Sequence, residues 1–177
     1  MEKLVTPRLE LVPFKLELIK AAIKGNAELA SLLGVQVLPN WQDEEFFADL
    51  PILVDILRQY PLQGEWGWGS LIIHQAENTL IGHVMVKIIP DSTGSPSGSL
   101  EIGYYVASSY RRQGYASEAT KAVVDWALSQ PTVQTVTAGC DRHNIASKRV
   151  LEKIGMQLAE TQEKMFVWKL CKTASVK

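Results

Sequence analysis

The sequence predicts an α/β (α+β) fold with a mixed central sheet of about six or seven strands and helices on both faces. Two observations predict this class. Strand-like and helix-like segments alternate in the second half of the chain, which favours parallel pairing. Before them, "EWGWGSLIIHQ" and "TLIGHVMVKII" meet at the polar stretch "QAEN", which is typical of an antiparallel hairpin. With 177 residues, 46% of them apolar, we expect a single domain over residues 1–177.

The first half of the chain begins with a predicted strand over about 8–13 and continues with helices. "KLELIKAAIKG" and "NAELASLLG" each end at a glycine, Gly25 and Gly34, that can terminate a helix. "DEEFFADLPILVDILRQY" starts with acidic residues, as a helix N-terminus prefers. Pro51 is expected to break or kink this third helix. The two hairpin strands follow.

The second half alternates strands and helices after a polar loop, "PDSTGSPSGS". The first of its helices shows apolar residues at helical spacing, and the second has Asn144 as its N-cap and Gly155 just past its end. The predicted order is a strand over 99–107, a helix over 115–129, a strand over 133–140, a helix over 144–155 and a last strand over 163–170.

Composition and charge exclude several classes of protein. The formal net charge of −1 gives no basic field for nucleic acid. Two cysteines without a Cys-x-x-Cys pair and three histidines without ligand spacing predict no metal site. The longest apolar run, "LPILVDIL", is too short to span a membrane. We therefore expect a cytoplasmic protein that binds neither nucleic acid nor membrane.

The stretch "RRQGYASEA" combines positive charge, a glycine and the start of a helix. The first amides of a helix lack backbone partners and carry partial positive charge, so they attract anions. Gly114 and Ala116 let a phosphate approach closely, and Arg111 and Arg112 add charge beside it. The stretch indicates a pyrophosphate cradle. An ordinary strand-to-helix turn with solvated arginines is the alternative.

Two longer stretches, "LEIGYYVASSYRRQGYASEATKAVVDWAL" and "NIASKRVLEKIGM", resemble the GCN5-related N-acetyltransferase superfamily. Within it, the sequence is similar to the ribosomal-protein (RimJ/RimL-like) branch. The strand, the Arg-x-x-Gly-x-Ala loop and the Asn-x-x-Ser…Lys-x-Gly helix match in order and spacing, as does the opening "PRLEL". The resemblance covers roughly residues 5–170 and implies a single-domain fold whose splayed strand pair holds coenzyme A.

The resemblance implies acetyl-CoA as the donor and an amine as the acceptor. The backbone of the strand that ends at Tyr104 and Val106 would pair with the pantetheine arm, and the Val106 amide would polarise the thioester carbonyl. Asn144 would reach the pantetheine arm or lie close to it, which is compatible with its role as an N-cap. The pyrophosphate would lie on the backbone amides of Arg112, Gln113, Gly114, Tyr115 and Ala116.

The attacking amine must be neutral, which at pH 7 holds for about one lysine amine in 2500 and about one α-amine in ten. Glu101 is the candidate base, because it lies on the strand leading to the cradle, on the face it shares with Gly103 and Tyr105. It could equally be a solvated or ion-paired strand residue. Ser147 is the candidate acid toward the leaving thiolate, or it bonds back to its own helix. The tyrosine that many family members place there is Leu151 here.

Other residues have structural interpretations beside functional ones. Trp66 and Trp68 alternate with glycines, so both indoles are expected on one face, as pocket lining or as core. Trp41 and the acids that follow it would lie on the acceptor side, where the acids attract an amine or serve a helix start. His83 and His143 are expected to be structural or solvated, and Cys140 to be a buried, inert thiol.

The acceptor is left open between two chemistries. The favoured prediction is a protein N-terminal α-amine, and the second is a small amine such as a polyamine, an amino acid or an amino sugar. A third possibility, supported by Leu151, is an acyl-CoA-binding sensor or adapter without catalysis. Self-association into a homodimer is compatible with the resemblance.

Overall fold

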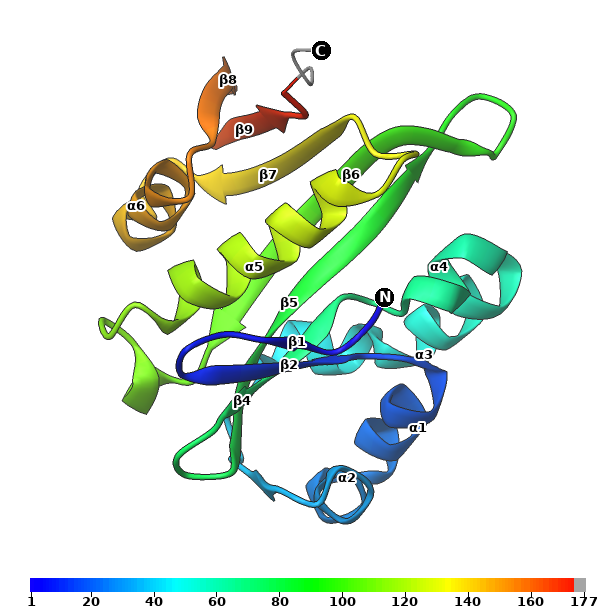
Figure 1. Ribbon diagram of the computed structural model, residues 1–177, viewed down its shortest axis with the longest axis vertical. Helices are drawn as coiled ribbons and strands as arrows, with labels where there is room; N and C mark the ends of the chain where they lie inside the picture. The colour runs from blue at the N-terminus through cyan, green and yellow to red at the C-terminus, as the bar shows by residue number, and fades with distance from the viewer. Residues whose placement is uncertain (174–177) are drawn as a thin grey trace.

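One mixed β-sheet runs through the computed structural model, which describes residues 1–173 (Figure 1). In these residues the sheet has nine strands in the order β1-β2-β4-β5-β6-β7-β9-β8, with β3 beside β5. The β6–β7 and β3–β5 pairs are parallel and the others antiparallel, so the predicted mixed sheet is confirmed. The strands are β1 Leu4–Val5, β2 Leu9–Pro13, β3 Gln36–Val37, β4 Ser70–His74, β5 Thr79–Pro90, β6 Pro96–Val106, β7 Thr135–Asp141, β8 Gln157–Thr161 and β9 Met165–Cys171.

The sheet has more strands than the six or seven expected, because three were not anticipated. β1 and β3 have two residues each, too few to leave a pattern in the sequence. β8 is exposed at all five positions, so it lacks the apolar alternation by which a half-buried strand is recognised. β6 also begins earlier than expected, at Pro96, which shortens the polar loop before it.

The helices cover both faces of the sheet, as predicted. α5 and α6 cover one face, where Val123 of α5 and Leu151 of α6 are buried in the core. α1, α2 and α3 cover the other face, where Trp41 and Leu50 are buried. Figure 1 shows α5 lying across the sheet over β5 and β6. Their bounds are α1 Leu16–Lys24, α2 Asn26–Leu33, α3 Glu44–Gln59, α4 Pro61–Trp66, α5 Tyr115–Ser129 and α6 Ile145–Lys153, with a 3₁₀ helix at Ser108–Tyr110.

Two features of the first half differ from those expected. Pro51 does not break α3, which runs continuously from Glu44 to Gln59; Pro51 lies exposed, so the carbonyl that loses its backbone donor there can be solvated. The strand expected from residue 65 begins only at Ser70, because Pro61 starts the short helix α4. Trp66 and Trp68 therefore do not share a face.

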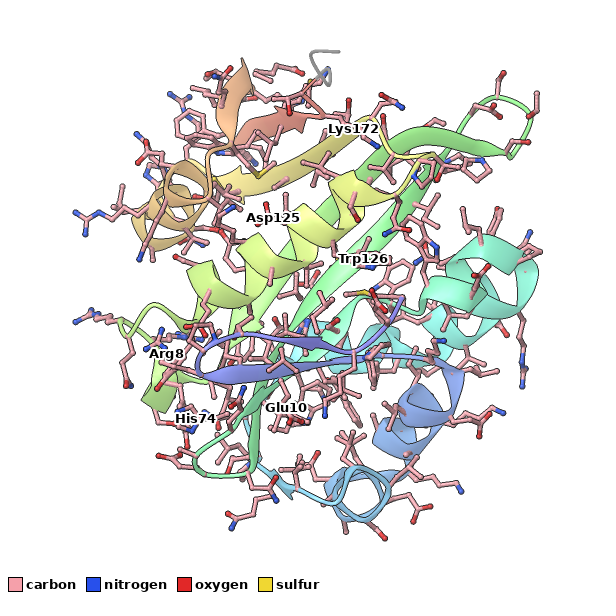
Figure 2. All side chains as sticks on the ribbon, viewed as in Figure 1. Arg8, Glu10, His74, Asp125, Trp126 and Lys172 are labelled. Carbon is pink, nitrogen blue, oxygen red and sulfur yellow. The ribbon has the colours of Figure 1, made fainter. Side chains whose placement is uncertain are left out.

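The two indoles belong to different cores on opposite sides of the sheet. Trp66 ends α4 and packs edge-on against Trp126 of α5, with ring centroids 4.9 Å apart. Trp126 is labelled on α5 in Figure 2. Trp68 lies in the other core, between Gly67 and Gly69, whose φ angles of 79° and 83° turn the chain there. Across residues 1–173, every helix is too short or too polar to traverse a lipid bilayer.

Candidate active site

The centre of the sheet opens between β6 and β7. These strands pair only where Ser99–Ile102 meets Thr135–Ala138. Beyond Ile102, β6 continues to Val106 and β7 continues to Asp141 without pairing to one another. On its other edge β6 stays paired with β5 as far as Val106 and Gly82. The two strands thus diverge toward their C-terminal ends, which is the splay that the resemblance implied.

The register of β5 and β6 decides which backbone groups face this gap. The Ala107 amide donates to the Ile81 carbonyl at 2.8 Å, in register with the ladder. In an antiparallel pair, alternate residues exchange hydrogen bonds with the partner strand. Gly103 and Tyr105 therefore turn their amides and carbonyls toward β5, whereas Tyr104 and Val106 turn theirs toward the gap. The Tyr104 amide and carbonyl and the Val106 amide can therefore pair with an extended ligand lying between β6 and β7, whereas the Val106 carbonyl already accepts from Arg111 Nε.

The predicted cradle lies beyond the end of β6. α5 begins at Tyr115 with Gly114 as its N-cap, and that cap makes no side-chain hydrogen bond to the helix. The amide of Glu118 donates to the Gly114 carbonyl at 3.0 Å, so the amides of residues 115–117 lie ahead of the first helical bond. Gly114 has φ 84° and Arg112 has φ 60°, both left-handed. Ala116, in the first turn, is small and half-buried.

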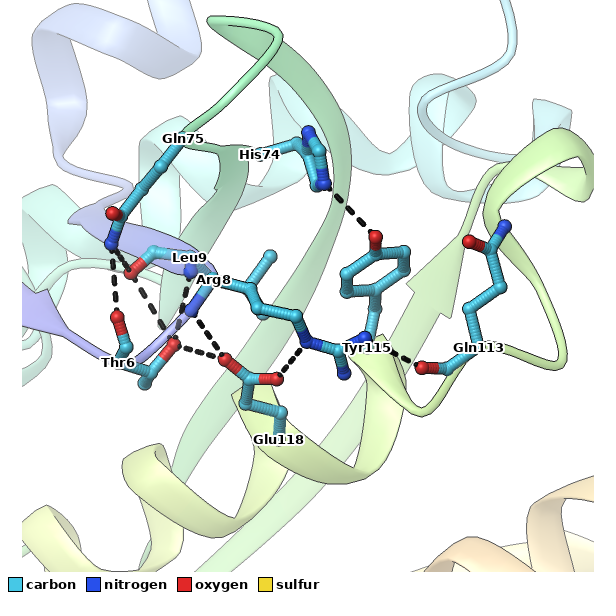
Figure 3. A network of polar contacts seen from close by, with 8 residues as sticks. All are labelled: Thr6, Arg8, Leu9, His74, Gln75, Gln113, Tyr115 and Glu118. Atoms are coloured by element: carbon cyan, nitrogen blue, oxygen red, sulfur yellow. Dashed lines mark hydrogen bonds and ion pairs between the residues drawn. The ribbon is translucent and has the colours of Figure 1, made fainter.

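A polar network that sequence analysis missed holds this cradle in place (Figure 3). Arg8, just before β2, donates through Nε to Glu118 Oε2 at 2.7 Å and through Nη1 to the Gln113 carbonyl at 2.9 Å. Thr6 Oγ1 donates to the same Glu118 carboxylate at 2.6 Å. Burial alone would raise the pKa of Glu118, but hydrogen bonds from Thr6 and Arg8 lower it below its usual value. The N-terminal segment thus braces the first turn of α5.

The side chain of Tyr115 fixes the start of α5 by its contacts with His74 and Arg8. Its ring is buried, its hydroxyl lies 2.9 Å from His74 Nε2, and the Arg8 guanidinium lies 4.2 Å from its ring centroid. The Tyr115 side chain is therefore structural, and its backbone amide is the group available to a ligand. The signal for Arg8 was present in "TPRLEL", but its partner lies 110 residues away, and spacing alone does not connect the two.

The cations around the cradle differ from those expected. A Cβ placed on Gly114 would lie 3.3 Å from an Arg8 guanidinium nitrogen and 4.0 Å from Lys153 Nζ of α6. Arg111 instead turns back toward β6, where its Nε donates to the Val106 carbonyl at 2.8 Å. Arg112 is exposed. Lys153 thus brings a cation to the cradle on one side, and Arg8, which is paired with Glu118, lies on the other; the motif itself reveals neither residue.

Two hydroxyl groups meet on the α6 side of the gap. Tyr104 donates to the Ser147 carbonyl at 3.0 Å, and its hydroxyl lies 2.7 Å from Ser147 Oγ. Burial raises the pKa of Tyr104 to about 12, although the hydrogen bond with Ser147 opposes the rise. Asn144 caps α6 by accepting from the Ser147 amide at 3.0 Å, which confirms the predicted N-cap. Leu151 is fully buried in the core beneath.

Glu101 lies on the opposite face of β6 from Tyr104. Its register partners are Lys87 on β5 and Thr137 on β7, the last stretch before the gap opens. Its side chain is half-buried, and its neighbour along the face is Gly103, over which the Met85 side chain packs: a Cβ on Gly103 would lie 3.1 Å from Met85 Cε. The structure therefore places the candidate base and the candidate acid on opposite sides of the same strand, both close to where β6 and β7 separate.

An aromatic cluster lies farther along the Glu101 face. His83 stacks on Phe46 with ring centroids 3.9 Å apart and lies beside Tyr105. Burial lowers the pKa of His83 to about 4, although the nearby Asp43 charge opposes the fall, and neither ring nitrogen has a partner within residues 1–173. Trp41 is fully buried in this cluster, so it is core rather than pocket lining.

The remaining expected residues have structural places. Asp43 is the N-cap of α3 and accepts from the Phe46 amide at 2.7 Å. Cys140 is buried, and the Trp168 indole donates to its sulfur at 3.3 Å. His143 is exposed. Within residues 1–173, no three His, Cys, Asp or Glu side chains gather into a group that could hold a metal ion.

Comparison with known proteins agrees with this geometry. The Acetyltransferase (GNAT) domain family matches residues 8–157. The uncharacterized N-acetyltransferase YjdG of Bacillus subtilis is 34% identical over 159 residues, 89% of this chain and 91% of its own. The fold is similar to the ribosomal-protein-S5-alanine acetyltransferase of Vibrio fischeri (TM-score 0.65, 15% identity, 96% of each chain). It is also similar to RimJ of Mycobacterium smegmatis in complex with CoA-disulfide (TM-score 0.61, 16% identity, 92% of this chain and 81% of that one). The chain belongs to the GNAT acetyltransferase family, and it is an N-acyltransferase.

Proposed function

We propose that the protein transfers acetyl from acetyl-CoA to the α-amine of a protein N-terminus. The observation that carries this proposal is the gap between β6 and β7, which leaves the Tyr104 backbone and the Val106 amide without a partner strand and leads to the glycine-capped start of α5. An extended arm with amides fits the first feature, and a pyrophosphate fits the second. Acetyl-CoA carries both groups and supplies an activated acetyl thioester.

The residues present fit this donor. Gly114 has no side chain where a phosphate would lie, and the amides of residues 115–117 lie ahead of the first helical hydrogen bond. Arg8 and Lys153 approach the same spot. The Val106 amide faces the gap and would donate to the thioester oxygen. Arg111 would act indirectly, because it holds the Val106 carbonyl.

Glu101 would take the proton that the amine must lose. It lies on the face of β6 away from α5 and α6, so the acceptor would approach from the side covered by α1 to α3. General base catalysis of this kind typically contributes 10²- to 10⁴-fold. An α-amine, with a reference pKa near 8, needs less help than a lysine near 10.4, and one partly exposed carboxylate suits the smaller task.

The pair formed by Tyr104 and Ser147 would supply the proton to the departing thiolate. Both hydroxyls are protonated at neutral pH, because the pKa of Tyr104 is raised to about 12. The pair lies on the α6 side of the gap, opposite Glu101. This arrangement offers an acid although Leu151 stands where many relatives carry a tyrosine, and it weighs against a sensor without catalysis.

The test combines donor binding with acceptor choice. Calorimetry with acetyl-CoA and dephospho-CoA measures donor binding. Thiol release is then followed with three acceptors: a lysine-free peptide with a free N-terminus, an Nα-acetylated peptide containing one lysine, and spermidine. We expect micromolar binding of acetyl-CoA and release with the first peptide at a kcat/KM well above the other two.

Other outcomes contradict parts of the proposal in distinguishable ways. Thiol release with spermidine and with neither peptide would show that the acceptor is a small amine and not a protein N-terminus. Binding of acetyl-CoA without release from any acceptor would favour the sensor. An absence of acetyl-CoA binding would contradict the donor site itself.

A further inference from the structure

A cavity lies at the edge of β5 beyond the start of β4, where Lys87 and the neighbouring Ile88 both line it. β4 begins at Ser70, opposite Val84, but β5 runs on to Pro90 beside α4. Gln63 of α4 replaces the missing strand there. Its Nε2 donates to the Val86 carbonyl at 2.9 Å, and its Oε1 accepts from the Ile88 amide at 2.7 Å. Between this junction and the β5–β6 arm, the chain encloses about 330 Å³.

The walls of this cavity are mostly apolar. Ile56 and Tyr60 contribute from α3 and its C-terminal end, Trp68 from the turn before β4, and Ile88 from β5. Among the described residues that line it, Lys87 alone carries a charge. The volume is at the small end of known ligand pockets, which suits one side chain or a small molecule rather than a protein segment.

One residue that lines the cavity, Lys87, is the cross-strand partner of the candidate base. Lys87 lies directly opposite Glu101 in the β5–β6 register, so the two side chains project from the same face. Cross-strand partners have Cβ atoms about 5 Å apart. A primary amine at Glu101 would therefore have an ammonium group and an apolar cavity as its next neighbours. A carboxyl or carbonyl oxygen complements the ammonium, and an apolar side chain complements the cavity.

We propose that this cavity receives the apolar side chain of the residue whose α-amine is acetylated, with Lys87 contacting the carboxyl or carbonyl oxygen of that residue. The inference rests on the proposed function. It names the acceptor class as α-amines with a large apolar side chain, such as leucine, methionine or phenylalanine. Such a residue would meet Glu101, Lys87 and the cavity through its three substituents.

The first test compares peptides that differ only at their first residue. Thiol release is measured with leucine, phenylalanine, alanine or serine at the N-terminus. Burial of a large apolar side chain predicts a kcat/KM about 10- to 100-fold higher for leucine or phenylalanine than for alanine. Equal values for all four peptides, or a preference for serine, would overturn the proposal.

Two tryptophan variants on the same helix locate the effect. Ile56→Trp fills the cavity, and we expect the ratio of leucine to alanine kcat/KM to fall close to one. Ile52→Trp adds the same ring one turn away, at a position that is 58% exposed and does not line the cavity, so the ratio should persist. If Ile56→Trp does not fold, Ile88→Phe fills the cavity from β5. Persistence of the ratio in a folded cavity variant would contradict the proposal.

A comparison of free leucine, leucinamide and the leucine peptide as acceptors distinguishes a free amino acid from the first residue of a peptide. Only free leucine carries a full carboxylate beside the amine, so Lys87→Met should weaken its use more than that of the peptide. Calorimetry of leucinamide with the CoA-loaded protein tests the cavity apart from turnover. Binding that Ile56→Trp removes and Ile52→Trp retains would support the cavity even if no acceptor is acetylated. Absence of leucinamide binding, together with acetylation of alanine peptides, would overturn the cavity alone.

Discussion

The proposed donor side and the proposed acceptor side of this molecule are built in different ways. The donor side uses backbone groups from one continuous stretch, the end of β6 and the start of α5, with α6 beside them. The proposed acceptor side uses side chains from α3, α4 and β5 that line one cavity, and one of them, Lys87, lies opposite Glu101 in the strand register. A site made of backbone binds a ligand that never varies, whereas a site made of side chains can differ between relatives without loss of the fold.

The difference also decides what each side tolerates. A change of side chain near Tyr104 or Val106 leaves their amides and carbonyls in place. A change at Ile56 or Lys87 alters the volume or charge of the cavity directly. Substitutions that disturb the backbone should therefore affect every reaction of the enzyme, and substitutions in the cavity should affect only the choice of acceptor.

The largest effect should come from the cradle. Gly114→Leu places a side chain at φ 84°, where a Cβ lies close to Arg8. Loss of two hydrogen bonds to charged phosphate, at about 1.5–3 kcal/mol each, predicts a CoA dissociation constant roughly a thousandfold higher by calorimetry. Gly34→Leu is the matched control, with φ 70° and nothing within 4 Å of its Cβ, and should bind CoA normally. Unchanged affinity in Gly114→Leu would remove the cradle from the donor site.

The aromatic cluster around His83, on the Glu101 face, should make the free energy of unfolding depend on pH. His83 has a pKa of about 4 in the fold and the ordinary 6.5 when unfolded, so below pH 6.5 the unfolded chain binds a proton that the folded protein excludes. The free energy of unfolding should therefore fall by about 3 kcal/mol between pH 7 and pH 4 through this residue, and not change through it above pH 7.

The measurement is urea unfolding from pH 4 to 8 for the wild type and for His83→Leu. The variant should lose that part of the pH dependence, whereas His143→Ala, at an exposed position, should keep it. Identical pH profiles in the wild type and His83→Leu would show that His83 takes up its proton in the fold as easily as in the unfolded chain. The aromatic cluster would then be open to water.

A smaller effect is expected for the hydroxyl pair. Tyr104→Phe and Ser147→Ala should each lower kcat by about tenfold, and the double variant should be little worse, because both change one proton donor. Tyr105→Phe, on the opposite face of the same strand, should stay within twofold. Fully multiplicative losses in single-turnover rates would show that the two hydroxyls act separately.

The contrast between backbone sites and side-chain sites also explains which features could be predicted from the sequence. The start of α5 and the cap of α6 were predicted, because Gly114 and Asn144 act on amides within three residues of themselves. The face of Trp66 was predicted wrongly, since Pro61 begins a helix where a strand pattern continued. Arg8 was missed because its partners lie more than 100 residues away. Nearby residues in the sequence determine local backbone geometry, whereas contacts between side chains far apart in the sequence cannot be predicted from either neighbourhood alone.

The cavity illustrates the limit most clearly. Lys87 and Ile56 come from different elements, and nothing in the sequence around either one shows that they line the same cavity. Only the register of β5 and β6 brings Lys87 opposite Glu101, and that register is set by the hairpin and by the packing of both faces.

Glu101 is where the donor and acceptor sides meet, and one measurement tests that claim most directly. Acetyl transfer is followed in single turnover from pH 6 to 9, with acetyl-CoA bound to the wild type and to Glu101→Gln. A base at this position predicts a rate about a hundredfold lower in the variant at pH 7, a gap that narrows as the amine loses its proton in solution, and an unchanged CoA dissociation constant. Equal rates in the two proteins across this pH range would contradict the account.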